Sequence, residues 1–329
     1  MSKVLDHPDA ELRVDELESG RRRLHLTSKR GLFVPVATWE TSYPVDLIAL
    51  ILEKTGVWVL DEIMRDEDPR YVAHGMRWEV LSYLEEGALE NVRILDFGSG
   101  SGASTMVLAR LAPSARIVGV ELDRDFVEIA RARARFHGVD HRVDFLDSMD
   151  PTGLPEGLGT FDYIVMTGVF EHLLPEERIR VMPQLWRCLK VEGMLFVNQT
   201  PHRWFPLEHH TTGLPLINYL PAALAGPMAR RLSSRMRPSD TWPTLLRKGI
   251  RGGTHGMVMG AIKPRPGTAT LMMPVRFGLR DQFDLWYEFS NSLQPSVMRR
   301  YAKWVFRSLH RVFGFTLVPY IAMAIRKTA

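Results

Sequence analysis

The sequence predicts an α/β protein built on a doubly wound, mostly parallel sheet. Between residues 92 and 199, short apolar runs alternate with helical patterns, and such alternation is typical of parallel strands joined by right-handed crossovers. A glycine-rich stretch follows the first apolar run directly. A polar residue lies at or next to the end of four of these runs, namely Asp96, Glu121, Asp147 and Thr167. Ligands of doubly wound sheets bind beyond the carboxyl ends of the strands, so we expect the site at this edge.

The first 90 residues are expected to form a mainly helical cap ahead of the sheet. Residues 21–33 alternate loosely between apolar and polar types, which indicates a β-hairpin near Gly31. Residues 43–54 have a helical pattern with Pro44 in the first turn, where proline is tolerated. A second helix is predicted over residues 71–86.

The region from 91 to 199 is expected to be the core. The apolar runs predict strands at residues 94–97, 116–120, 143–146, 161–167 and 194–199. Helical patterns lie between these runs, at residues 104–111, 125–137 and 175–189, with a short helix after Val169.

The glycine-rich stretch, Val92 to Thr105, has the sequence V-R-I-L-D-F-G-S-G-S-G-A-S-T. Its glycines let the backbone approach a ligand, and the following helix offers free N–H groups. Gly98-x-Gly100-x-x-Ala103 also fits the dinucleotide fingerprint. Two features argue against a dinucleotide. Asp96 places a carboxylate where a pyrophosphate would be repelled and an ammonium group attracted, and Glu121 is placed to accept ribose hydroxyls.

The run I-L-D-F-G-S-G-S-G, followed by V-G-V-E-L-D, resembles the first two motifs of class I S-adenosylmethionine-dependent methyltransferases. The segment Phe161–Leu173 resembles the fourth motif and the E-H-L that follows it. This resemblance implies a seven-stranded sheet and S-adenosylmethionine as cofactor. The glycine turn would hold the methionine part, Glu121 the ribose, Asp147 the adenine, and the strand ending at Thr167 would lie beside the methyl group. The implied cofactor residues are Asp96, Gly98, Ser99, Gly100, Gly102, Glu121, Leu122, Asp147, Ser148 and Thr167.

The loop from Asn198 to Pro221 follows a strand end and concentrates polar and aromatic residues among four prolines. We expect it to form a substrate lid, with Arg203, Trp204 and Glu208 as binding residues; a rigid connector is the alternative. An alcohol acceptor would need a base of near-neutral pKa, as histidine provides. The catalytic candidates are His172, His202, His209 and His210.

No metal is expected. Adjacent histidines rarely bind one ion, no cysteine assists them, and the Asp…Asp-Asn set of magnesium-dependent catechol methyltransferases is missing.

Charge divides the chain of 329 residues unevenly. Residues 201–329 contain 19 Lys or Arg and 5 Asp or Glu, although the whole chain has a net charge of only +4. This asymmetry suggests an anionic partner: a membrane surface, nucleic acid or a phosphorylated substrate. A single cysteine, Cys188, excludes an internal disulfide. The charged N-terminus lacks a signal-peptide core and no apolar run reaches about 18 residues, so we expect a cytoplasmic protein.

Residues 296–313 form the clearest amphipathic helix, with Arg299, Arg300, Lys303, Arg307 and Arg311 in one arc. We expect its apolar side to pack on the sheet and its basic side to face solvent, because residues 316–325 then form the closing antiparallel strand. The alternative is a helix lying on an anionic membrane.

Together these features predict a cap at residues 1–90, a cofactor-binding core at 91–199, a basic lid insertion at 200–265, and C-terminal helices with the closing strand at 266–329. Residues 61–221 are similar to bacterial methyltransferases of polysaccharide or secondary-metabolite pathways. We therefore expect O-methylation of a sugar, glycolipid or other small hydroxylated acceptor, which could be linked to a lipid. An RNA methyltransferase is one alternative, although N-P-P-Y and D-P-P-Y motifs are missing. A non-catalytic cofactor-binding protein is the other. The sequence leaves the oligomeric state open.

Overall fold

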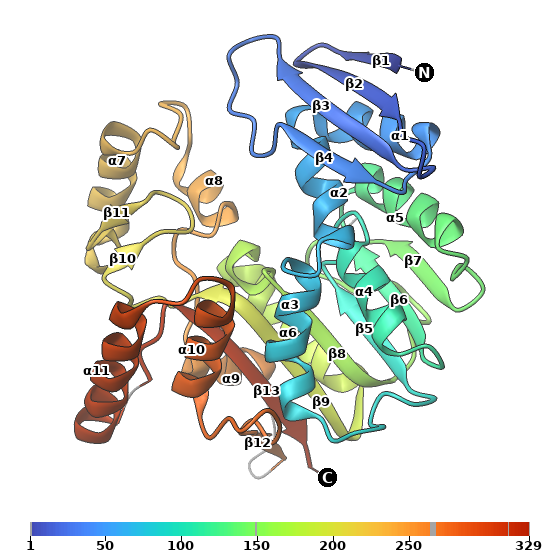
Figure 1. Cartoon of the computed structure of the whole chain (residues 1–329). Coiled ribbons are helices and arrows are strands. Elements are labelled where there is room, and N and C mark those ends of the chain that lie inside the picture. The colour runs from blue at the N-terminus through green and yellow to red at the C-terminus, as the bar shows by residue number, and fades with distance from the viewer. Residues whose placement is uncertain (1, 149, 264–267, 315, 329) are drawn as a thin grey trace. The chain divides into compact units, whose positions relative to one another are not determined.

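The computed structural model describes residues 2–148, 150–263, 268–314 and 316–328 and has a mixed α/β fold (Figure 1). The chain divides into two compact units. Unit 1 comprises residues 1–76, 89–91 and 99–149, and unit 2 comprises residues 77–88, 92–98 and 150–329. The main sheet has seven strands in the order β12-β13-β9-β8-β5-β6-β7.

Unit 1 begins with an antiparallel sheet in place of the predicted helical start. Its strands are β1 (Ser2–His7), β2 (Ala10–Glu16), β3 (Arg22–Ser28) and β4 (Thr38–Thr41). Of the hairpin predicted over residues 21–33, only the first strand, β3, is present in that range; its partner β4 begins at Thr38, so Gly31 lies in the longer loop between them. Strands β1 and β2 were not predicted, although β2 buries every second residue from Ala10 to Val14, as expected of a half-buried strand.

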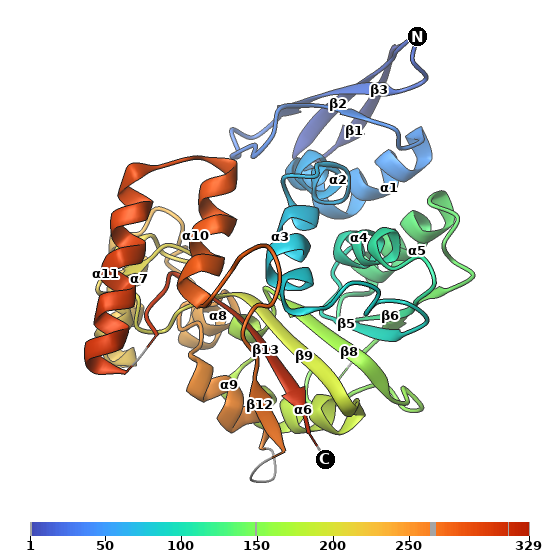
Figure 2. The ribbon, with the colours of Figure 1, turned by 60° about the horizontal axis from the view of Figure 1, so that its bottom comes forward.

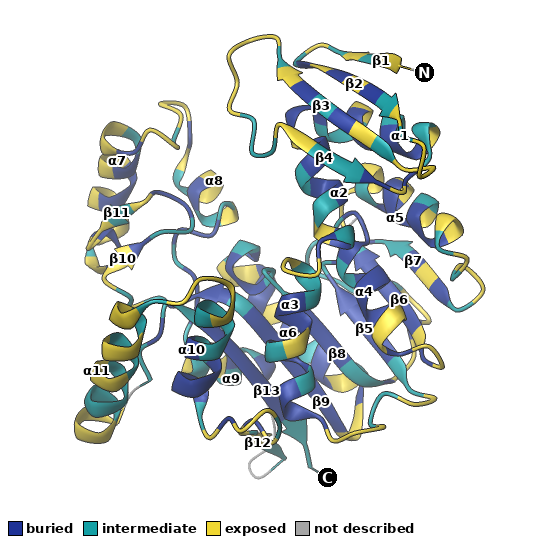
Figure 3. Ribbon diagram, viewed as in Figure 1, coloured by how far each residue is buried: buried dark blue, intermediate teal, exposed yellow. Residues whose placement is uncertain are grey.

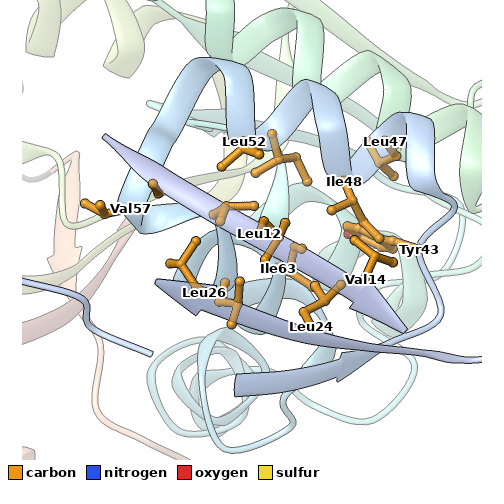
Figure 4. Close-up of a cluster of buried hydrophobic side chains, with 14 of the residues drawn as sticks. Leu12, Val14, Leu24, Leu26, Tyr43, Leu47, Ile48, Leu52, Val57 and Ile63 are labelled. Carbon is orange, nitrogen blue, oxygen red and sulfur yellow. The ribbon is translucent and has the colours of Figure 1, made fainter. Parts of the chain in front are cut away.

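Two helices cover this small sheet, α1 (Val45–Thr55) and α2 (Val59–Glu67), joined by a 3-10 turn, η1 (Gly56–Trp58). Leu12 and Leu24 of the strands and Ile48 and Ile63 of the helices are fully buried in one cluster (Figure 4). Burying side chains of this size stabilises the fold by about 1.5–3 kcal/mol each. The N-terminal strands and helices therefore share one hydrophobic core, to which Ile129 also contributes.

Unit 1 also contains two parallel strands of the main sheet, β6 (Arg116–Glu121) and β7 (Val143–Asp147), with helices α4 (Ala103–Leu111) and α5 (Arg124–Phe136). These elements match the predictions within one or two residues. Asp123 caps α5, because its carboxylate accepts a hydrogen bond from the backbone N–H of Asp125.

Unit 2 contains the other strands of the main sheet. Strands β5 (Arg93–Phe97), β8 (Phe161–Thr167) and β9 (Leu189–Pro201) are parallel, and β13 (Tyr320–Lys327) runs antiparallel to β9. A short strand, β12 (Ala269–Leu271), pairs with the outer side of β13. The predicted closing antiparallel strand is confirmed, shifted a few residues toward the C-terminus.

The remaining elements connect or cover these strands. Helix α3 (Val72–Glu79) and turn η2 (Leu81–Tyr83) precede β5, whereas turn η3 (Phe170–His172) and helix α6 (Pro175–Cys188) lie between β8 and β9. The predicted lid insertion contains β10 (Leu207–Glu208), β11 (Leu214–Pro215), η4 (Ile217–Tyr219), α7 (Ala222–Leu232), α8 (Trp242–Arg247) and α9 (His255–Ile262).

The last two helices of unit 2, α10 (Gln282–Leu293) and α11 (Val297–Phe313), lie side by side (Figure 2). The prediction that α11 packs its apolar side on the sheet is wrong. No residue of α11 is buried (Figure 3), and most of its large apolar residues are exposed, although Phe306 packs against Phe205 and Trp286. Two of its cations instead face α10: Arg307 pairs with Asp281 and Asp284, and Lys303 pairs with Asp284.

None of the helices among the described residues is both long enough and apolar enough to cross a membrane.

Candidate functional site

The glycine turn after β5 adopts a conformation that requires glycine. Gly100 and Gly102 have φ angles of +53° and +84°, a region that side chains with a Cβ atom rarely occupy. A Cβ at Gly102 would lie 2.7 Å from the Cβ of Ala130, so the absence of a side chain at Gly102 permits the close approach of α5 to the turn. A Cβ at Gly100 would meet nothing within 4 Å. The backbone at Gly100 is therefore open to an approaching ligand.

A buried arginine fixes this turn inside unit 1. Arg133 of α5 is fully buried, and its guanidinium donates to the backbone oxygen of Ser101 at 2.9 Å and to the Ser101 hydroxyl at 2.6 Å. The same guanidinium donates to the backbone oxygen of Glu62 in α2. Such contacts hold the turn without help from a ligand. Arg133 was not predicted as a site residue, because an arginine in a surface-type helical pattern looks like a solvated charge.

The Glu121 carboxylate, at the end of β6, is bound to the glycine turn. Its Oε2 accepts the N–H of Gly100 at 2.8 Å, and its Oε1 accepts the N–H groups of Leu122 at 2.7 Å and Asp123 at 3.1 Å. Because Gly100 is the single donor to Oε2 among the described residues, this oxygen can accept a further hydrogen bond from a hydroxyl. This geometry fits the predicted ribose contact.

Asp147 and Ser148 lie beside Glu121 in unit 1, as their positions at a neighbouring strand end predict. Asp147 pairs with Glu121 in the register of β6 and β7, and the N–H of Ser148 donates to the backbone oxygen of Glu121 at 2.8 Å. The Asp147 carboxylate accepts Nε of Arg124 at 2.9 Å. The structure thus brings together the predicted ribose and adenine residues.

The other predicted cofactor residues belong to unit 2. Asp96 is buried near the end of β5, and Gly98 has a φ of +74° with Val169 against its α-carbon. Thr167 is the last residue of β8, and its hydroxyl is buried without a hydrogen-bond partner among the described residues. Asn198 of β9 lies opposite Thr167. Both polar atoms of the Asn198 side chain are also buried without a hydrogen-bond partner among the described residues. Buried polar groups usually have partners, so these atoms are free to hydrogen-bond a water molecule or a polar ligand.

Asn198 was named in the sequence analysis only as the first residue of the lid. A signal was present, because Asn198 ends an apolar strand on the edge where Asp96 and Thr167 end theirs.

Glu171, His172 and His210 form a cluster that the sequence does not reveal, because His210 is contributed by the lid. The His172 and His210 rings have centroids 5.4 Å apart, and Nε2 of His172 lies 3.8 Å from Oε1 of Glu171. Glu171 is buried; its Oε2 accepts the Thr200 hydroxyl at 2.9 Å, whereas Oε1 has no hydrogen-bond partner among the described residues. Burial raises the pKa of Glu171, and His172 opposes this.

The lid fixes the protonation pattern of His172. Nδ1 of His172 lies 2.8 Å from the backbone oxygen of Arg247, which assigns the proton to Nδ1 and leaves a lone pair on Nε2. The Arg247 guanidinium binds Glu177 of α6 at 2.7 and 2.5 Å, and this pair fastens α8 to α6. Gly249 packs against the cluster with no room for a side chain, since a Cβ there would lie 2.9 Å from the His210 ring and 3.1 Å from Cγ of Glu171.

The remaining predicted histidines lie elsewhere in the lid. His202 is buried, and its Nδ1 accepts the N–H of Trp204 at 3.2 Å. Burial, reinforced by His255, lowers the pKa of His202 to about 4. Burial and the adjacent His172 lower the pKa of His210 to about 4 as well. His209 packs edge-on against Tyr320, with ring centroids 4.6 Å apart.

Contacts within the lid hold the predicted substrate-binding residues, Arg203, Trp204 and Glu208, in place. The Arg203 guanidinium donates to the backbone oxygen of Asn218 and lies 4.2 Å from the Trp204 ring. Trp204 is about half exposed and stacks on Tyr219. The buried Glu208 carboxylate accepts the backbone N–H groups of Thr211 at 2.8 Å and Thr212 at 2.6 Å. The Trp204 ring therefore offers a flat apolar surface on a stiff loop.

Glu171, His172 and His210 could also supply three metal ligands, since one ligand atom of each lies within 4.8 Å of the others. The sequence analysis did not consider this set. No metal was expected, and that expectation stays a prediction.

The fold and the glycine turn define a nucleotide-binding α/β domain, and comparison with known proteins makes the class specific. Residues 94–193 match a family described as a methyltransferase domain. A ribosomal protein L11 methyltransferase from Pelobacter propionicus is 36% identical over 174 residues, which cover 52% of this chain and 50% of that protein. An erythromycin 3''-O-methyltransferase from Saccharopolyspora erythraea is 34% identical over 111 residues, which cover 34% of this chain and 35% of that protein.

Among solved structures, the plantazolicin methyltransferase BpumL in complex with SAH aligns over 86% of this chain and 94% of that one, with 12% identity and a TM-score of 0.45. The chain spans half or less of the length of the two curated relatives described above. Residues 94–193 therefore match a methyltransferase domain, and the S-adenosylmethionine cofactor that the sequence motifs imply agrees with this match. The carboxylate at the glycine turn fits the ribose of this cofactor, as described for Glu121.

Proposed function

We propose that the protein is an O-methyltransferase that acts on a small hydroxylated acceptor such as a sugar, glycolipid or secondary metabolite. The observation that carries this proposal is the cluster that Glu171 and His172, which follow β8 in the region that matches a methyltransferase domain, form with His210 of the lid. A hydroxyl must lose its proton as it is methylated, and a histidine with a free lone pair can accept that proton.

The cofactor residues keep the roles implied by the resemblance. Glu121 would hold the ribose, Asp147 and Ser148 the adenine, and Asp96 the ammonium group. When bound, S-adenosylmethionine supplies a methyl group that is already activated by a sulfonium. The protein then has to orient the acceptor in line with that methyl group and keep water out, which is mainly a proximity effect.

His172 is the proposed base among the four histidine candidates. Its Nδ1 proton is held by the Arg247 backbone oxygen, so Nε2 can receive the acceptor's proton. The Glu171 carboxyl group, 3.8 Å away, would stabilise the resulting imidazolium. His202 and His210, with pKa values lowered to about 4, are weak bases near neutral pH. We assign His210 to positioning His172.

The acceptor is proposed to meet the lid at Trp204. An exposed aromatic ring can stack on the apolar face of a sugar or another cyclic metabolite. Arg203, already held against this ring, carries a charge suited to a phosphate or carboxylate. Glu208 contributes by fixing the loop through its hydrogen bonds to Thr211 and Thr212.

The decisive experiment is calorimetric titration with S-adenosylmethionine and, in parallel, NADH. We expect binding of the first alone, and a loss of about tenfold or more in affinity for Glu121→Ala, because the ribose loses a charge-assisted acceptor. Glu90→Ala, at an exposed glutamate in the same unit, is the control and should bind normally. Unchanged affinity in Glu121→Ala would mean that the ribose lies elsewhere.

If the sulfonium cofactor binds, release of S-adenosylhomocysteine should next be measured with hydroxylated and phosphorylated glycans. Turnover with a hydroxylated acceptor, and none with RNA or protein, is the expected result. Methylation of an amine acceptor only would contradict O-methylation.

A further inference from the structure

Helix α11 is amphipathic, but its orientation is the reverse of that of an ordinary surface helix. A helix on a globular protein normally turns its apolar side inward. In α11, the exposed fractions of Met298, Tyr301, Trp304 and Val312 are 74%, 64%, 69% and 72%. Val297, Val305 and Phe313 are exposed as well. This outward strip, called the α11 strip, consists of Val297, Met298, Tyr301, Trp304, Val305, Val312 and Phe313.

Specific polar contacts impose this orientation. The Arg307 guanidinium donates to both carboxylate oxygens of Asp281, at 2.8 and 2.7 Å, and lies 2.8 Å from Asp284. Lys303 lies 3.2 Å from the Asp284 carboxylate and 3.9 Å from the centre of the Tyr287 ring. Because Lys303 and Arg307 pair with Asp281 and Asp284, the strip on the opposite side of α11 has to face outward. The exposure of the strip is therefore built into the helix pair.

The charges around the strip indicate what covers it. The segment 297–313 contains no Asp or Glu. At about 100° per residue, Arg300 and Arg311 lie next to Trp304 on one edge of the strip, and both are exposed. Neither has an ion-pair partner among the residues that the structure describes. The edge of the strip is thus cationic.

A second copy of the chain is a poor occupant. A two-fold contact through α11 would bring both copies of the same uncompensated arginines into one interface, in a part of the chain that has 19 basic and 5 acidic residues. An anionic bilayer has the opposite charge. Its interface also suits Trp304 and Tyr301, whose rings combine an apolar body with a polar edge.

We propose that α11 is a membrane-docking helix, which inserts the α11 strip into the interface of a bilayer that contains anionic phospholipid. Arg300 and Arg311 would contact the lipid headgroups, and Trp304 and Tyr301 would enter the acyl boundary. This deepens the proposed function by favouring an acceptor carried at a lipid surface. Vesicle binding itself needs neither cofactor nor acceptor, so it stands or fails independently of methyl transfer.

The test uses the full chain and sedimentation with vesicles of phosphatidylcholine, either alone or mixed with phosphatidylglycerol. We expect binding to the mixed vesicles only, weakening as salt is raised. The variants Tyr301→Ser/Trp304→Ser and Arg300→Glu/Arg311→Glu should each weaken binding about tenfold or more. Ile179→Ser, at an exposed apolar residue of α6, is the matched control and should bind like the parent.

Calorimetric affinity for S-adenosylmethionine and the melting temperature should be the same in all variants, since every changed side chain is exposed. Absence of binding to the mixed vesicles, or equal binding by the parent and the α11 variants, would overturn the proposal. A dimer in light scattering that Tyr301→Ser/Trp304→Ser converts to monomers would also overturn it, by showing that a second copy covers the strip.

Discussion

Single residues decide what the proposed catalytic cluster can do. The Arg247 backbone oxygen fixes the proton on Nδ1 of His172, and Glu171 lies against Nε2. His172→Asn removes the proton acceptor, and general-base catalysis of this kind typically contributes 10²–10⁴-fold. We expect the rate constant kcat to fall within this range while calorimetric affinity for S-adenosylmethionine stays the same. His141→Asn, at an exposed histidine, is the control; equal kcat values in the two variants would remove His172 from the mechanism.

Gly249 is the residue on which the shape of the cluster depends. Its φ of +92° is unfavourable for a side chain, and an added methyl group would push against His210 and Glu171. Gly249→Ala should lower kcat by about tenfold or more through misplacement of these groups. Gly260→Ala is the matched control, since a Cβ there meets nothing within 4 Å. Normal kinetics in Gly249→Ala would show that the packing around His210 is not required.

At the scale of elements, α3 is linked to β9 by a buried acid. Burial raises the pKa of Glu79 to about 8, and Nε2 of Gln199 donates to its carboxyl group at 3.0 Å. Between pH of about 4.5 and 8 the folded chain keeps a proton that the unfolded chain releases, so this group makes stability fall as pH rises.

Glu79→Gln should remove that dependence. The variant should melt at a higher temperature than the parent at pH 8 and at a similar temperature at pH 5, because the neutral amide needs no proton. Thermal unfolding across this range, with the exposed Glu86→Gln as control, measures the effect. The same pH slope in Glu79→Gln as in the parent would contradict a raised pKa in Glu79.

The sequence could predict most strands of the main sheet but not how the last helix is oriented. Strands β5 to β9 were predictable because each is an apolar run that ends in a polar residue or a turn. Helix α11 was predictable as a helix but not in its orientation, because periodicity shows which residues share a face and not what that face meets. Asp281 and Asp284, on a different helix, decide the orientation. The proximity of His172 and His210 depends on the path of the lid, which no local pattern encodes.

At the scale of the whole molecule, the basic balance of residues 201–329 leaves the RNA methyltransferase as a rival. Part of that positive charge is neutralised within the protein. Acidic residues form ion pairs with Arg247, Lys248, Lys303 and Arg307. We therefore expect weak RNA binding that disappears by about 150 mM salt, as non-specific phosphate contacts do. Fluorescence anisotropy with a labelled single-stranded RNA measures it. Tight, saturable binding that survives such salt would favour the rival.

The hydrogen bonds around Glu121 limit how many ribose hydroxyls its carboxylate can accept. A carboxylate has about four lone-pair positions, and three are occupied by the N–H groups of Gly100, Leu122 and Asp123. One position remains, on Oε2, whereas a ribose brings two hydroxyls. The two hydroxyls are therefore unequal: one can bind Glu121 directly, and the other must share an oxygen or find another partner. Deoxy analogues of the cofactor, one lacking the 2′-hydroxyl and one lacking the 3′-hydroxyl, should differ in affinity accordingly.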